Sequence, residues 1–94
     1  MLPPIEAFDW DEGNRTKCAK HGVPPAEIEA LLRGNPGVAP DLRHSHGEDR
    51  FIAVGRNTAG RPMFVAFTIR TREGHCLIRP ISARSHARER GQSL

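Results

Sequence analysis

Aromatic side chains are scarce in this 94-residue chain, which contains one Trp, four Phe and no Tyr. Without tyrosine, no phenolic hydroxyl can act as an acid or a base in catalysis. A stacking platform of the kind that many readers of single-stranded nucleic acid use also has few rings to draw on. If the chain binds a nucleic acid, contacts with phosphate groups must therefore dominate.

Cysteines and long apolar segments are also few. Cys18 and Cys76 lie far apart in the sequence and form no CxxC pair, which favours two free thiols that fill small spaces in the core. The sequence shows no signal-peptide pattern and no apolar run long enough to cross a bilayer. These absences predict a cytoplasmic protein with no membrane segment.

Acidic side chains are nearly missing from the stretch 50–90, which holds nine arginines and two acids. Residues 1–37 carry four basic and six acidic side chains, whereas residues 38–94 carry ten basic and five acidic ones. The planar guanidinium forms bidentate contacts with phosphate, and arginines gathered on one face are typical of a nucleic-acid-binding surface. The alternative is an ordinary solvated charged surface.

The N-terminal third predicts a short strand followed by two helices. Residues 5–8 are the strand candidate, and Asp9 with Glu12 predicts the cap of a helix over residues 11–21. Gly22 is the expected left-handed residue after that helix. Three basic side chains fall in its last predicted turn: Lys17, Lys20 and His21.

The second helix is predicted to begin at Val23-Pro24-Pro25, because proline is accepted in a first helical turn. Its apolar side chains recur at helical spacing, which places Ile28, Leu31 and Leu32 on one face. The segment Gly34-Asn35-Pro36-Gly37 is predicted to end it.

From residue 38 onward the pattern predicts strands joined by short polar links. The expected strands are residues 38–43, 50–56, 62–70 and 75–82. Links of about four residues that contain glycine fit antiparallel hairpins. The odd positions from Met63 to Ile69 form an apolar face that alternation directs toward the helices, while Thr68 and Arg70 point the other way.

Residues 84–91 are expected to form a short basic helix. The whole chain, residues 1–94, is then a single α+β domain. It has an antiparallel meander sheet, two N-terminal helices packed on one face and a short C-terminal helix, and its other face is left for the arginines.

The segment 43–50 (RHSHGEDR) concentrates polar side chains at a predicted hairpin. Cleavage of RNA by its own 2′-hydroxyl needs a base, an acid and cations for the charge that develops on phosphorus. His44 or His46, Glu48, and Arg50 with Arg56 are candidates for these roles. Solvated turn residues are the simpler interpretation.

A metal site is a further alternative for His44 and His46, with His21, His75 or Glu48 as the third ligand. Neither the spacing nor the absence of nearby cysteine matches a structural zinc pattern.

Three other features of the sequence have their own interpretations. Lys20-His21 could bind phosphate or could complement the dipole at the end of a helix. Trp10 at a helix start is typical of a core anchor. Arg84 is predicted at the end of a strand, where rigid backbone suits a binding site, although pairing with Glu89 on the surface is also open.

Several short motifs together resemble, in order and spacing, the BrnT family of type II toxins, over roughly residues 8 to 90. The motifs are Phe8-Asp9-Trp10-Asp11, Lys20-His21-Gly22-Val23, His44-Ser45, residues 48–56, Gly60-Arg61, Phe67-Thr68-x-Arg70 and residues 79–84. Each motif alone is weak, and the ordered set is specific.

The resemblance implies a RelE-like fold and a ribonuclease activity that inhibits translation, with no metal cofactor. It implies neutralisation by a BrnA-like ribbon-helix-helix antitoxin in a hetero-oligomer, which meets operator DNA only through the antitoxin complex. A non-catalytic basic module that binds nucleic acid or an acidic partner, such as a decayed toxin, is the alternative function.

Carried over position by position, the basic residues of the family's motifs fall on Arg50, Arg56, Arg61, Arg79 and Arg84, with His44 and Glu48 in the segment that begins at His44-Ser45. The resemblance and the residue types together give two groups of candidates. The catalytic candidates are Arg50, Arg56 and Arg84, with His44, His46 and Glu48 as proton handlers. The candidates for RNA binding are Lys20, Arg61, Arg70 and Arg79. Two departures from the family pattern are Lys17, where the family commonly has Asn, and the end at residues 89–94, where family members usually continue a helix containing a Tyr.

Overall fold

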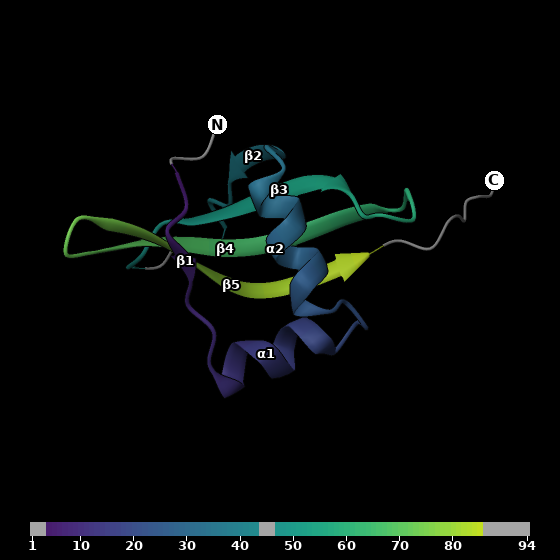
Figure 1. Ribbon diagram of the computed structural model, residues 1–94, viewed down its shortest axis with the longest axis horizontal. Coiled ribbons are helices and arrows are strands. Elements are labelled where there is room, and N and C mark those ends of the chain that lie inside the picture. The colour runs from purple at the N-terminus through teal and green to yellow at the C-terminus, as the bar shows by residue number, and fades with distance from the viewer. Residues whose placement is uncertain (1–3, 44–46, 86–94) are drawn as a thin grey trace.

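A computed structural model describes residues 4–43 and 47–85 as two helices and one five-stranded sheet (Figure 1). The elements are β1 (Ala7–Phe8), α1 (Glu12–Ala19), α2 (Pro25–Arg33), β2 (Gly37–Pro40), β3 (Arg50–Arg56), β4 (Pro62–Arg72) and β5 (His75–Ser85). The strand order is β1-β5-β4-β3-β2. Strands β2 to β5 form the predicted antiparallel meander, whereas β1 pairs parallel to β5. The α+β class is therefore confirmed, with a mixed sheet.

Helix α1 begins two residues later than the predicted cap pair indicates. Its N-cap is Asp11, whose side chain accepts a hydrogen bond from the Asn14 backbone N–H, while the Asn14 side chain accepts one from the Asp11 backbone N–H. The expected pair of Asp9 and Glu12 is wrong, because this reciprocal box satisfies the first orphan N–H groups instead. The helix ends at Ala19, so His21 lies beyond it, in the turn before Gly22.

Helix α2 follows the sequence pattern closely. Pro25 occupies the first turn, and the buried side chains are Ile28, Leu31 and Leu32. The helix crosses one face of the sheet, whereas α1 lies alongside β5 (Figure 1). No helix in the described ranges is long and apolar enough to cross a membrane.

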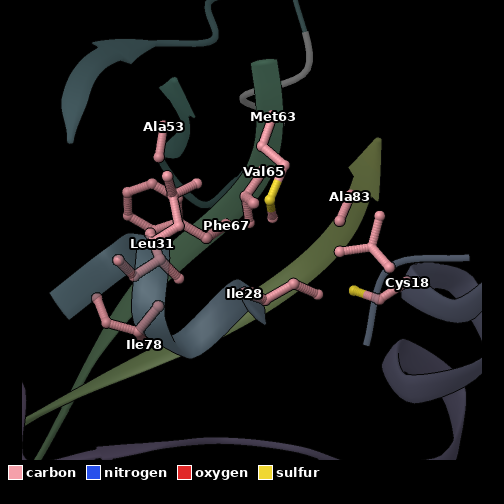
Figure 2. Close-up of a cluster of buried hydrophobic side chains, with 11 residues drawn as sticks. Cys18, Ile28, Leu31, Ala53, Met63, Val65, Phe67, Ile78 and Ala83 are labelled. Carbon is pink, nitrogen blue, oxygen red and sulfur yellow. The ribbon is translucent and has the colours of Figure 1, made fainter. Parts of the chain in front are cut away.

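The core fills the space between the helices and this face of the sheet (Figure 2). Met63, Val65 and Phe67 are buried there, which confirms the alternation expected for β4, and Ile69 is half-buried. Cys18 is fully buried among them, as a small core residue should be. Burial raises the pKa of the Cys18 and Cys76 thiols, both of which are free.

Strands β4 and β5 are longer than the sequence indicates. They are joined by a tight hairpin in which Glu73 and Gly74 both have positive φ, 54° and 80°, the geometry of a two-residue hairpin turn. Arg84 and Ser85 continue β5, so a helix beginning at residue 84 is wrong. The rest of that predicted helix, residues 86–91, lies outside the described residues.

A bulge in β5 explains part of this error. Ala66 pairs with Ser82, but Phe67 pairs with Pro80, so that Ile81 is an extra residue in the strand. Such a residue shifts the alternation of side chains by one position. Proline has no N–H to donate, and a bulge accommodates it because the regular hydrogen-bond ladder is interrupted there. The period-two pattern is therefore broken within β5.

Candidate active site

A pocket of about 400 Å³ lies on the face of the sheet opposite α2. Its floor is apolar and is formed by Ile52, Phe64 and Ala66. These residues alternate along β3 and β4 with the core positions, which fixes them on the opposite face. Four titratable side chains from four segments of the chain also line the pocket, namely His21, Asp41, Arg50 and Arg84, and Ser82 of β5 adds a hydroxyl.

The two arginines of the pocket come from different strands and have different surroundings. Arg50 starts β3, and its Nε lies 3.7 Å from Oδ2 of Asp41, with side chains 25% and 10% exposed. Arg84 projects from β5, is exposed, and makes no hydrogen bond or ion pair with the described residues. The pocket thus holds one anchored guanidinium and one that can meet an anion directly.

His21 is the third cationic or proton-binding group at this pocket. It lies in the turn between α1 and α2 and is exposed. Within the part of the chain that the structure describes, it makes no hydrogen bond or ion pair. The interpretation of His21 as a dipole-complementing residue in the last helical turn is wrong, because α1 ends two residues earlier.

A second ionic cluster occupies the other half of the sheet face and joins β4 and β5 to the start of α1. Arg79 Nη1 lies 2.7 Å from Oδ2 of Asp11 and 3.8 Å from Oδ2 of Asp9. Arg70 Nη1 lies 3.6 Å from Oδ2 of Asp9, and Arg70 Nε lies 3.3 Å from Oε2 of Glu48. Two of the arginines predicted to bind RNA are therefore paired with carboxylates.

These contacts also act on the carboxylate of Asp11. The backbone hydrogen bond from Asn14, followed by the side-chain hydrogen bond from Arg79, holds the pKa of Asp11 below its ordinary value. Both contacts favour the charged form.

Asn14 is the buried polar centre of this cluster. Its side-chain N–H₂ donates to the backbone oxygens of Asp9 and Pro80, both at 2.9 Å, and its side-chain oxygen accepts from the Asp11 N–H at 2.7 Å. The side chain is 3% exposed. Sequence reasoning missed Asn14, although an Asn three residues after an Asp is a recognisable variant of the capping box.

Arg56 is not among the side chains that line this pocket. It lies at the opposite end of β3 from Arg50, and six residues of strand span about 20 Å. Its Nη1 donates to the backbone oxygen of Gly60 at 2.7 Å, which closes its own hairpin. Arg61 is exposed in the same hairpin turn.

The remaining predicted residues fall in three places. Lys20 is exposed beside His21. Glu48 is bound to Arg70 and does not line the pocket. His44 and His46 lie outside the described residues.

The structure therefore brings together two of the predicted catalytic residues, Arg50 and Arg84. It adds His21 and Asp41, which the sequence did not place there. Among residues 4–43 and 47–85, no group of three His, Cys, Asp or Glu side chains is arranged to hold a metal ion.

The fold and the pocket define a small α+β domain whose sheet face offers guanidinium groups over an apolar floor, an arrangement suited to a phosphate-bearing ligand. The family model of the ribonuclease toxin BrnT of type II toxin-antitoxin systems matches residues 10–89. The chain therefore belongs to the BrnT family of ribonuclease toxins, which confirms the resemblance seen in its motifs. No curated protein sequence matches the chain.

Proposed function

We propose that this protein is an endoribonuclease with a RelE-like fold that cleaves RNA in the pocket between Arg50 and Arg84 and so inhibits translation. The observation that carries the proposal is the convergence of these two guanidiniums, from β3 and β5, on one cavity with an apolar floor. Cleavage of an RNA strand builds negative charge on the phosphoryl oxygens in the transition state, and fixed cations stabilise that charge. Membership of a ribonuclease toxin family supports the same reaction.

The two arginines have different proposed roles. Arg50, held by Asp41, keeps a fixed orientation and binds the scissile phosphate. Arg84 is exposed and without a partner among the described residues, so it approaches the phosphoryl oxygens and stabilises the charge that they gain. Phe64 and Ile52 form the surface on which the ribose or base of the bound nucleotide rests.

Arg50→Ala and Arg84→Ala should each lower the rate of RNA cleavage about 100-fold or more, the usual effect of removing one donor to a developing oxyanion. Arg72→Ala is the matched control, since it removes the same charge from an exposed position on β4 that does not line the pocket. Each variant is incubated with RNA, with and without ribosomes, and induced in cells to score growth.

The outcomes separate the candidate functions. Full cleavage and full toxicity in both pocket variants would place the reaction elsewhere. RNA that binds in a salt-dependent manner but stays intact with the unaltered protein would instead indicate the non-catalytic binding module.

The proposed antitoxin is a ribbon-helix-helix protein encoded beside this gene, and the complex represses its own operon. The type II family assignment supports an antitoxin partner. Coexpression of the neighbouring gene should restore growth, and the purified complex, but not the toxin alone, should bind operator DNA. Growth arrest that persists with the neighbour present would contradict this pairing.

A further inference from the structure

We propose that His21 is the proton acceptor of this site, the catalytic residue that takes the proton of the attacking 2′-hydroxyl of RNA. The inference rests on the proposed ribonuclease function and adds a third residue to Arg50 and Arg84.

The choice of His21 follows from the groups that line the pocket. The described lining residues that can accept a proton efficiently are Asp41 and His21, since a serine hydroxyl is a weak base. Asp41 is only 10% exposed and faces the guanidinium of Arg50 at 3.7 Å, where it serves as a counter-ion. His21 is exposed at the pocket and has no partner among the described residues.

Neighbouring residues fix the backbone position of His21. Gly22 follows it with φ of 77°, a left-handed conformation that suits glycine. Cys18 and Val23 flank the turn and are buried, at 0% and 3% exposed. The turn is therefore fixed to the core on both sides, while the His21 side chain stands on the pocket side.

The charged groups around His21 come from each segment that forms the pocket. Arg84 projects from β5, Arg50 from β3 and Asp41 from the end of β2, while Lys20 is its exposed neighbour in the turn. The cations receive the phosphate, and among the described lining residues the imidazole is the group left to accept a proton. Histidine suits this role because its charge ordinarily changes near neutral pH.

The proposed step is the attack of a ribose 2′-hydroxyl on the adjacent phosphorus. The imidazole nitrogen of His21 takes the proton of the ribose 2′-hydroxyl, and the 2′-oxygen attacks phosphorus to form the new P–O bond. The bond from phosphorus to the 5′-oxygen breaks, and that oxygen leaves with the electron pair and takes a proton from solvent water. The products are a 2′,3′-cyclic phosphate and a 5′-hydroxyl, and the imidazolium returns its proton to solvent.

The test compares His21→Gln with His75→Gln. His75 is the control because it is an exposed histidine at the far end of β5, paired with Glu6 and remote from the pocket lining. Cleavage rates at saturating RNA are measured from pH 5 to 9, together with the melting temperature. Binding is measured with the same oligonucleotide carrying 2′-deoxyribose at the cleavage site, which cannot be cut.

In His21→Gln the saturated rate should fall about 100-fold or more, and the fall of rate at acidic pH should disappear. Affinity for the uncleavable RNA and the melting temperature should stay close to those of the unaltered protein. The products of the unaltered protein should carry a 2′,3′-cyclic phosphate. His75→Gln should keep the rate and its pH profile.

Three results would overturn the inference, and they differ from failure of the proposed function. A saturated rate and acidic limb unchanged in His21→Gln would remove His21 from the chemistry. Weaker binding with an unchanged saturated rate would make it a phosphate contact, and loss of the alkaline limb instead would make it a proton donor. If the unaltered protein cleaves no RNA, the proposed function fails first and the inference fails with it.

Discussion

Replacing Asn14 by alanine should lower the free energy of unfolding by about 2–4 kcal/mol. The change leaves the Pro80 carbonyl, which is buried where Asn14 contacts it, without its donor. An orphaned buried acceptor costs about 1–3 kcal/mol. The partner groups on Asp9 and Asp11 are only partly buried, so water replaces much of their loss, and the broken helix cap adds about 1 kcal/mol.

This loss should lower the melting temperature by about 8–32 °C, since 1 kcal/mol corresponds to about 4–8 °C in a domain of this size. Unfolding is followed by circular dichroism and by fluorescence of Trp10, the single tryptophan, whose indole N–H donates to Glu29 at 2.8 Å. Urea titration of the same samples gives the free energy directly.

Two further variants test whether the hydrogen bonds of Asn14 stabilise the fold. Asn57→Ala is the control, because the Asn57 side chain also bonds to the backbone, accepting from the N–H groups of Ala59 and Arg61, but in an exposed turn. Its cost should stay below about 1 kcal/mol. Asn14→Asp keeps the acceptor but loses both donors, so it should destabilise at least as much as alanine. A loss of stability in Asn14→Ala no larger than that in Asn57→Ala, or a harmless Asn14→Asp, would show that the Asn14 hydrogen bonds do not stabilise the fold in this way.

Three other predictions concern packing, pH and thiol chemistry. Gly55→Ala should lower the free energy of unfolding by about 1–3 kcal/mol, measured in urea, because the added methyl meets the Leu31 side chain; Leu31→Ala in the same chain should recover part of the loss. The hydrogen bond from the Asn14 backbone holds the pKa of Asp11 below its ordinary 3.8, so the stability advantage over Asp11→Asn should be complete above that pH. The advantage should vanish as the pH falls through the lowered folded-state value; an advantage that grows in acid would contradict this. Cys18, whose thiol pKa is raised by burial, should resist iodoacetamide until the protein unfolds, as peptide mass spectrometry would show.

Much of the fold follows from local patterns. The bounds of β3 coincide with the prediction for residues 50–56, and the apolar faces of α2 and β4 are placed correctly. Local periodicity suffices there because each segment keeps one period from end to end. It fails in β5, where the bulge at Ile81 breaks the alternation and the basic residues after it suggested a helix.

The site was less predictable, because charge alone does not reveal which arginines have partners. The carboxylates that bind Arg70 and Arg79 come largely from Asp9 and Asp11, at the other end of the chain. His21 and Arg84 are also far apart in the sequence, yet both line one pocket. Tertiary pairing of this kind has no signature in local spacing.

The parallel pairing of β1 with β5 sets the order in which the protein can be completed during its synthesis. The hairpins from β3 to β5 join neighbouring segments and can form early, because short loops cost little entropy to close. β1 and α1 leave the ribosome before β5, the strand against which both pack. A nascent chain that stops before β5 has neither a partner strand for β1 nor the segment that carries Arg84, so the pocket is assembled only after β5 has been synthesised.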